Sequence, residues 1–328
     1  MFELGPRAMP LAAICVLALS AGWPNPAKGQ SVAEPGLFDA AAEGDGGNKI
    51  SLEQCHRLEQ DQTAVWVKVQ AKGWCLRYYA FGLGGENAIA AAWLNGDIVG
   101  GDGTSPAGHQ TGLGPMAMIE QERVLSQTYR TPFIFLARPG TYGSAGEHRA
   151  LHSTKLEADL VAAEIDALTA RYGVRSWVLG GHSGGGTDVA ALLARRHDIR
   201  CAVVSSGGAA YSAYLTAHHQ SWRIRSDNLN AIDDVGKIPI STASRVIVMG
   251  DPRDRSVFWS VQHLYYDALK ERGINVTLLP LKRGWPPEFH SLVNLAEAAT
   301  GLCAQGVATS EIETRLRAMP SQAPRESN

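Results

Sequence analysis

The stretch from residue 176 to residue 196, SWVLGGHSGGGTDVAALLARR, constrains the fold of this chain more than any other. A short apolar run at residues 177–179 breaks into glycines around Ser183, and helical spacing resumes immediately afterwards. A serine flanked by glycines between a strand and a helix is the pattern of a sharp turn that exposes the serine hydroxyl. Side chains at positions 181 and 185 would collide with neighbouring backbone, so both positions require glycine. The sequence predicts a strained, outward-pointing Ser183, faced by N–H groups of the new helix.

The glycine pattern alone is weakly specific, because the chain contains 35 glycines. An alternative interpretation is a glycine-rich phosphate-binding or packing turn, but this stretch has neither G-x-G-x-x-G nor a Gly-Lys-Ser/Thr ending. In its strand-to-helix context the pattern resembles the nucleophile elbow of the α/β-hydrolase superfamily, which includes esterases and prolyl-oligopeptidase-like catalytic domains. The resemblance covers roughly residues 60 to 303 and rests on element order outside the elbow.

Composition excludes several classes of protein. The chain has 328 residues, of which 45% are hydrophobic and 19% charged, as expected for a compact enzyme with a large core. Its net charge of −2 gives no electrostatic footprint for nucleic acid or an anionic membrane. The histidines and cysteines lack metal-ligand spacing, so we expect no metal and no other cofactor.

The amino-terminal residues have the pattern of an export signal. Arg7 supplies a sparse positive region, and residues 11–21 form an apolar run that is too short to span a bilayer comfortably. Small residues then offer several cleavage points: Ser20, Gly22, Ala27 and Gly29. We therefore predict a signal peptide at residues 1–29 and a periplasmic or secreted protein without stable membrane insertion after cleavage; a retained membrane anchor is the alternative.

Export would leave an even number of cysteines in an oxidising compartment, which allows two disulfides. These cysteines are Cys55, Cys75, Cys201 and Cys303. Pairing Cys55 with Cys75 would clip the amino-terminal region to the first hairpin, and pairing Cys201 with Cys303 would tie a central strand to the last helix. Three connectivities are compatible with the sequence.

Strand-like and helix-like segments alternate along the rest of the chain. Strands are predicted at residues 64–69, 74–79, 88–94, 133–136, 177–179, 201–204, 245–249 and 276–279. Helices are predicted at residues 115–129, from a Thr154–Glu157 capping box to Gly173, after the elbow, and at 257–272 and 292–302. The first two strands form an antiparallel hairpin with a turn at Lys72-Gly73.

This alternation predicts an α/β fold with a mostly parallel, doubly wound sheet, because parallel strands need crossover helices. We expect an amino-terminal extension at residues 30–60, the α/β-hydrolase domain at 61–303 and a carboxy-terminal tail at 304–328, disordered from residue 320. Residues 209–244 are too short for more than a small cap.

In such sheets the functional groups gather at the carboxyl ends of the strands. The superfamily supplies a serine, an acid and a histidine in that chain order, and this chain has Ser183, Asp254 and His290. Asp251 competes with Asp254 as the acid. Asp254 is preferred because Val257 follows three residues later, as the resemblance implies, and because Pro252 fixes a turn after Asp251.

Other histidines are weaker candidates for the base. His263 is predicted in the middle of a helix, and His218 and His219 lie in the polar segment. A surface or capping role is the alternative for His290 itself.

The resemblance also implies two backbone donors for an oxyanion. One is the N–H of Gly184; the other would come from the turn Asn95-Gly96-Asp97, which stands where the superfamily has His-Gly-x. Asp97 would donate through its backbone with its carboxylate turned away, and Ile98 is the alternative donor. Tyr142, His182 and Trp285 lie near these loops and either line a substrate pocket or serve packing.

These residues predict an exported serine hydrolase that cleaves a carboxylic ester through an acyl-enzyme. A peptidase or amidase of prolyl-oligopeptidase-like type is the alternative, although such proteins usually carry a large amino-terminal domain for which this chain leaves no room. A silent binding protein on the same scaffold is a third hypothesis. The expected partner is a small-molecule ester or short peptide; the sequence does not indicate the oligomeric state.

Overall fold

The structure is a computed structural model that describes residues 36–38, 43, 47–98, 110, 112–241 and 244–320. The predicted signal peptide and residues 321–328 of the tail lie outside these ranges.

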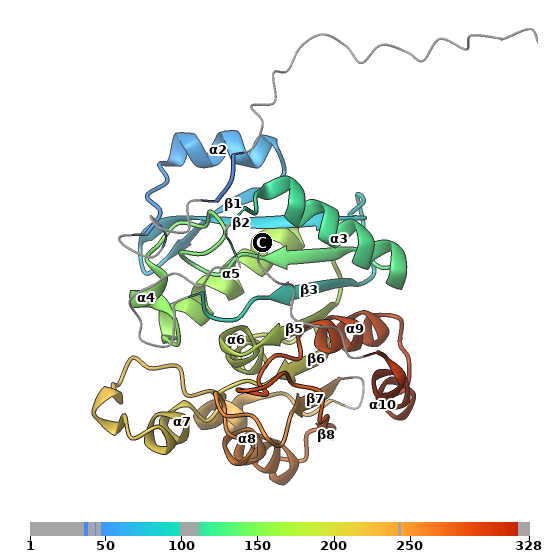
Figure 1. Ribbon diagram of the computed structural model, residues 1–328. Helices are drawn as coiled ribbons and strands as arrows, with labels where there is room; N and C mark the ends of the chain where they lie inside the picture. The colour runs from blue at the N-terminus through green and yellow to red at the C-terminus, as the bar shows by residue number, and fades with distance from the viewer. Residues whose placement is uncertain are drawn as a thin grey trace, which may run out of the picture. The chain divides into compact units, whose positions relative to one another are not determined.

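A sheet of eight strands, in the order β1-β2-β4-β3-β5-β6-β7-β8, runs through the described residues (Figure 1). The strands are β1 (Ala64–Val69), β2 (Lys72–Phe81), β3 (Ala90–Leu94), β4 (Phe133–Leu136), β5 (Trp177–His182), β6 (Ile199–Ser205), β7 (Arg245–Gly250) and β8 (Val276–Pro280). β2 is antiparallel to both β1 and β4, and the remaining neighbours are parallel. The carboxyl ends of β3 to β8 therefore meet at one edge.

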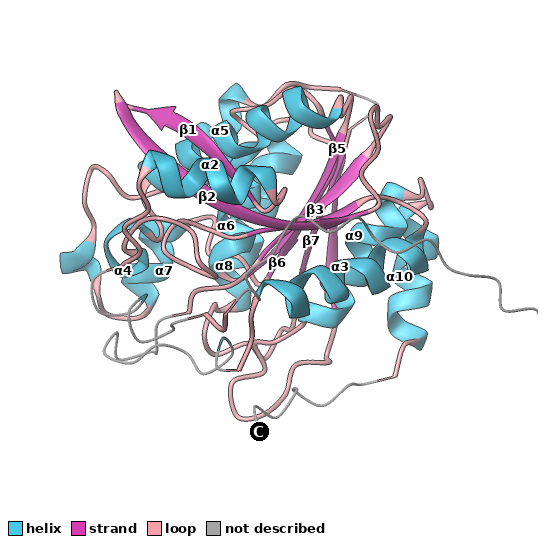
Figure 2. Cartoon of the chain, turned by 90° about the horizontal axis from the view of Figure 1, so that it is seen from above, coloured by secondary structure: helices cyan, strands magenta, loops and turns pink. Residues whose placement is uncertain are grey.

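Helices cover both faces of the sheet (Figure 2). One face packs against α5 (Lys155–Tyr172), α6 (Gly184–Leu192) and α8 (Trp259–Glu271), and the other against α3 (Pro115–Tyr129), α9 (Val293–Ala304) and α10 (Thr309–Ala318). Further helical segments are α2 (Leu52–Gln60), α4 (His148–Leu151), α7 (Tyr211–Ala217), η2 (Ser221–Arg223) and η3 (Ala231–Lys237). The predicted fold class is confirmed, including the antiparallel hairpin and the small segment after β6.

Residues at the helix ends explain where α3 begins and where α5 begins and ends. Pro115 occupies the first turn of α3, where its missing N–H has no helical role. The Thr154 side chain accepts the Glu157 N–H at the start of α5, and Gly173 ends that helix with φ 57°. Glycine adopts this left-handed conformation without strain.

The predicted turn of the first hairpin was wrong by two residues. Lys72 pairs with Val69 within the ladder, and the chain reverses at Gln70 and Ala71, which have φ 50° and 63°. Gly73 instead lies under the Trp66 ring, which a Cβ at this position would overlap. The glycine that suggested a turn is therefore required for cross-strand packing.

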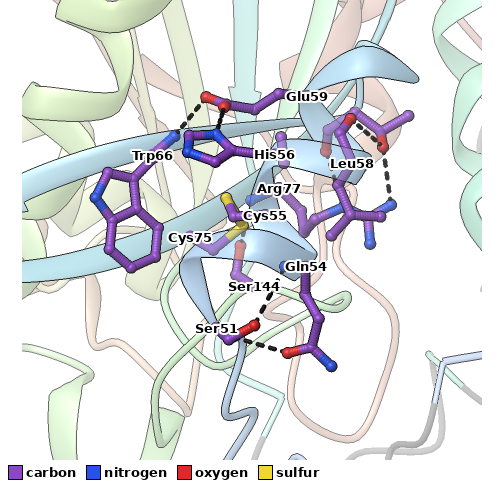
Figure 3. The surroundings of a disulfide bond; sticks show 12 residues. Ser51, Gln54, Cys55, His56, Leu58, Glu59, Trp66, Cys75, Arg77 and Ser144 are labelled. Atoms are coloured by element: carbon purple, nitrogen blue, oxygen red, sulfur yellow. Dashed lines mark hydrogen bonds and ion pairs between the residues drawn. A yellow bond between two sulfur atoms is a disulfide. The ribbon is translucent and has the colours of Figure 1, made fainter.

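The amino-terminal helix α2 is fixed to this hairpin by a disulfide between Cys55 and Cys75 (Figure 3). A reciprocal capping box starts α2: Ser51 accepts the Gln54 N–H, and the Gln54 side chain accepts the Ser51 N–H. The second disulfide joins Cys201 on β6 to Cys303 on α9. The sequence allowed three connectivities. The structure has the one that pairs Cys55 with Cys75 and Cys201 with Cys303.

The carboxy-terminal region contains a helix that the sequence analysis did not predict. Ile312 and Leu316 of α10 are buried in the core that α3 and α9 form on their side of the sheet.

Within the described ranges, no helix combines the length and apolar character needed to cross a membrane.

Candidate active site

The predicted elbow lies between β5 and α6, at the carboxyl edge of the sheet. Ser183 has φ 56° and ψ −121°, a strained conformation for a residue with a side chain. A Cβ at Gly181 would overlap the backbone of Gly185, and one at Gly185 would overlap the carbonyls of Leu94 and Asn95. The flanking glycines therefore permit the close approach of backbone segments that the turn requires.

The loop after β7 places a buried carboxylate beside His290. Asp254 Oδ2 lies 2.8 Å from His290 Nδ1. Asp254 Oδ1 accepts the backbone N–H groups of Ser256 and Val257, each at 2.9 Å. Gln262 Nε2 lies 3.3 Å from Oδ2. These donors fix the carboxylate and leave Oδ2 directed at the imidazole.

The competing aspartate, Asp251, has a different set of partners. Its Oδ1 accepts the backbone N–H and Nε–H of Arg253 at 2.9 and 3.0 Å, and its Oδ2 accepts Arg253 Nη2 and the Gly284 N–H at 2.7 and 2.9 Å. Burial alone would raise the pKa of Asp251, but the hydrogen bonds from Arg253 and Gly284 lower it below its usual range. Asp251 thus joins the loop after β7 to the loop that carries His290.

His290 is also held from the side of β6. Ser206 Oγ donates to the His290 carbonyl at 3.1 Å, and the His290 ring lies 4.7 Å from the His182 ring, centroid to centroid. His182 Nδ1 lies 3.3 Å from Ser205 Oγ. Burial, with the nearby His290, holds the pKa of His182 well below its usual range, so His182 is neutral. His290 therefore lies beside the residue that precedes Ser183.

The turn after β3 lies against the elbow. A Cβ at Gly96 would lie 3.3 Å from Ser183 Cβ and 3.5 Å from the His182 carbonyl oxygen. Gly184 is the first residue of α6, where backbone N–H groups have no partner within the helix. The predicted oxyanion donors therefore lie on two segments that are in direct contact.

Behind this contact lies a charge cluster that the sequence analysis did not identify. Arg138, fully buried after β4, contacts three carboxylates. Its Nη1 lies 2.8 Å from Asp97 Oδ1, its Nη2 2.9 Å from Glu157 Oε1, and its Nε 2.6 Å from Asp188 Oδ2. The cluster connects the turn after β3 to α5 and α6.

Two histidines complete the cluster around Asp97. His148 Nε2 lies 3.4 Å from Asp97 Oδ1, and His152 Nδ1 lies 3.6 Å from Oδ2. Burial alone would raise the pKa of Asp97, but Arg138 and His152 hold it well below its usual range. Burial lowers the pKa of His148 to about 4 and raises that of Asp188 to about 6. Asp97 is therefore ionised and His148 neutral at neutral pH.

Glu157 corrects one sequence prediction. The Thr154 half of the capping box is present, but the Glu157 carboxylate does not accept the Thr154 N–H; it accepts the Ser153 N–H at 2.7 Å and faces Arg138. The Thr154 N–H donates to the Leu151 carbonyl instead. The pairing with Arg138 competes with local capping because both partners are buried.

The three predicted pocket residues lie in different environments. Tyr142 is buried, and its ring lies 5.5 Å from that of Phe38 and 4.8 Å from that of Phe135, as in a packed core. His182 contacts His290, as described above. Trp285 lies in the loop between β8 and α9 with 37% of its surface exposed.

Two of the competing histidines, His263 and His218, contact groups other than the Asp254 carboxylate. His263 Nδ1 lies 2.9 Å from Asp267 Oδ2, one helical turn along α8. His218 Nε2 lies 2.9 Å from the Ser256 carbonyl, and its ring stacks on Phe258.

Within the described part of the chain, no group of three or more His, Cys, Asp or Glu residues has an arrangement that could hold a metal ion.

Comparisons with known proteins identify the fold. The Pyrococcus furiosus esterase Pf2001 superposes with a TM-score of 0.52 at 12% identity, over 88% of this chain and 99% of the esterase. Pyrococcus horikoshii acylaminoacyl peptidase superposes with a TM-score of 0.50 at 11% identity, over 74% of this chain. The match spans only 39% of the peptidase. No family model matches the sequence, and no curated protein does either.

The chain has the α/β-hydrolase fold, as the elbow pattern suggested. Two proteins that share this fold with it are the Pyrococcus furiosus esterase, over 99% of its length, and the Pyrococcus horikoshii peptidase, over 39% of its length.

Proposed function

We propose that the protein is a serine hydrolase that cleaves a carboxylic ester through an acyl-enzyme. The observation that carries this proposal is the 2.8 Å contact between Asp254 Oδ2 and His290 Nδ1, beside a serine held at φ 56° on an elbow. A carboxylate bound to Nδ1 holds the imidazole in the tautomer whose Nε2 can accept a proton. A base of this kind is what a serine hydroxyl needs to become a nucleophile.

In the proposed reaction, His290 Nε2 takes the proton of Ser183 while Oγ attacks the ester carbonyl carbon. The negative charge that develops on the carbonyl oxygen is stabilised by the backbone N–H groups of Gly184 and Asp97. His290 then gives its proton to the departing alkoxide, and an acyl-enzyme remains. Water, deprotonated by His290, attacks this ester and releases the acid and the free Ser183 hydroxyl.

An ester is favoured over a peptide bond because the match spans 99% of the esterase but only 39% of the peptidase. The deciding experiment measures hydrolysis of p-nitrophenyl esters of increasing acyl length and of aminoacyl p-nitroanilides. We expect ester turnover that falls about a thousand-fold or more in Ser183→Ala. Anilide turnover that exceeds ester turnover would assign the protein to the peptidase class, and equal ester turnover in Ser183→Ala would refute the mechanism.

We also propose that the protein is exported, with residues 1–29 removed as a signal peptide. The Cys55–Cys75 and Cys201–Cys303 disulfides support this, because stable disulfides form in oxidising compartments. Amino-terminal sequencing of the protein recovered from the periplasm or medium should begin after the predicted cleavage region. Recovery only from the cytosol with an intact amino terminus would contradict export.

A further inference from the structure

We propose that Arg138 is the positioning residue of the oxyanion site, because its guanidinium ties the Asn95-Gly96-Asp97 turn to the elbow helix. The inference rests on the proposed function and adds a residue that does not itself touch the substrate. It also gives a role to a buried charge cluster that the triad does not use.

The guanidinium contacts both sides of the turn. Nη1 donates to the Asn95 carbonyl at 3.2 Å and to Asp97 Oδ1 at 2.8 Å. These bonds hold the backbone of residue 95 and the side chain of residue 97 in one geometry. The Asp97 carboxylate is thereby paired with Arg138, which is consistent with the proposed donation to an oxyanion through the backbone N–H of Asp97.

The same guanidinium contacts the element that carries the second donor. Its Nε lies 2.6 Å from Asp188 Oδ2 on α6, and Nη2 lies 2.9 Å from Glu157 on α5. A Cβ at Gly184 would overlap both Asp97 Oδ1 and Arg138 Nη1. The cluster thus packs directly behind the Cα atom of Gly184, and its geometry sets the spacing between the two proposed N–H donors.

Charge adds a second reason for an arginine here. The Asp97 carboxylate lies close to the place where the reaction would develop negative charge, and an unpaired anion there would oppose the reaction. Arg138 offsets this charge and, because its donors form a planar fork, it holds several oxygens at once. Lysine would supply the same charge from a single point and could not maintain all these contacts.

The test compares the acylation step in Arg138→Lys with that in Arg196→Lys. Arg196 is the matched control, because it is a buried arginine with carboxylate partners, Asp166 at 2.6 Å and Asp198 at 2.7 Å. It follows the carboxy-terminal end of α6, whereas Arg138 packs against the start of that helix. The burst-phase rate constant for a p-nitrophenyl ester, KM, and the Ki of a boronic acid that forms a tetrahedral adduct with Ser183 are measured at equal folded fraction.

We expect Arg138→Lys to lower the acylation rate and the boronic acid affinity in parallel, each by about 10- to 100-fold, with KM within about threefold of wild type. Arg196→Lys should stay within about twofold of wild type in all three. Should Arg138→Lys fail to fold, Asp188→Asn weakens the tie to α6 with a nearly isosteric side chain and should give the same pattern at about three- to tenfold.

Two outcomes would separate the proposals. A wild-type enzyme that shows no burst and no boronic acid inhibition would refute the serine hydrolase itself. A reactive wild type, with folded Arg138→Lys or Asp188→Asn acylating at the wild-type rate, or with a change confined to KM, would overturn the positioning role alone.

Discussion

Asp254 and His290 are joined across two loops by a 2.8 Å contact between Oδ2 and Nδ1, whereas Asp251, three residues earlier, has both oxygens occupied by Arg253 and Gly284. The two aspartates therefore differ in partner, although both follow the same strand and both are buried. One carboxylate faces the imidazole, and the other holds the loops in place.

The first prediction separates these two roles. Asp254→Asn should lower kcat by about 10⁴-fold, because the imidazole loses the group that fixes its tautomer and pairs with its charged form. Steady-state ester hydrolysis at matched folded fraction measures the effect. The amide is close in shape to the carboxylate, so we expect the variant to fold.

Asp251→Asn is the matched control for that prediction. It should reduce the free energy of unfolding by about 1–3 kcal/mol, since an amide replaces a carboxylate that accepts several hydrogen bonds, and kcat should change by less than about tenfold. The reverse pattern, with Asp251→Asn silent and Asp254→Asn active, would transfer the role of the acid to Asp251.

The second prediction concerns the disulfides. Mass spectrometry of the exported, unreduced protein should find no free thiol at any of the four bonded cysteines. Replacing Cys201 and Cys303 by serine should lower the free energy of unfolding by about 4–5 kcal/mol, because the bond closes a loop of 102 residues.

The Cys55–Cys75 bond provides the comparison, since its loop of 20 residues predicts a smaller loss of about 3 kcal/mol. Denaturant titration under non-reducing conditions measures both values. A larger loss from the Cys55–Cys75 pair would show that strain or residual structure outweighs chain entropy.

The third prediction is a pH dependence of stability that passes through His148. Its pKa is about 4 in the folded protein and 6.5 ordinarily, so the unfolded chain takes up the proton first as the pH falls. Stability contributed by neutral His148 is complete above pH 6.5 and should be lost between pH 6.5 and about 4, by about 3 kcal/mol.

Comparison with His148→Gln isolates this contribution. Asp188 acts in the opposite sense, because its raised pKa of about 6 makes the folded protein gain stability as the pH falls towards 4. We therefore expect the unfolding free energy of wild type, minus that of His148→Gln, to decrease as the pH falls. Parallel curves from pH 7 to pH 4 would show that His148 does not titrate in this way.

The parts of the fold that sequence reasoning predicted are those with short-range signals. The apolar run before Ser183 predicts a strand because its side chains are buried. Pro115 at the start of α3 and Gly173 at the end of α5 act through their own backbone conformations. The turn predicted at Lys72-Gly73 was wrong because the sequence does not distinguish a glycine that packs under the Trp66 ring from a glycine that makes a turn. Helix α2, which the sequence analysis did not predict, does have a local signal, the Ser51–Gln54 capping box.

The charge cluster could not be predicted in the same way. Arg138 lies in a glycine-rich loop, and Asp188 lies in the elbow helix, 50 residues further along the chain. Charged side chains are usually solvated, so nothing local indicates that these bury one another. Their pairing depends on how β4, α5 and α6 meet, which only the tertiary structure shows.

Labelling with a fluorophosphonate tests the central claim most directly, because these probes react much faster with an activated serine than with an ordinary one. We predict that the folded protein forms a covalent adduct, which peptide mass spectrometry locates at Ser183, and that Ser183→Ala forms none. Folded protein that stays unlabelled, or that is labelled at another residue, would contradict the assignment of Ser183 as the nucleophile.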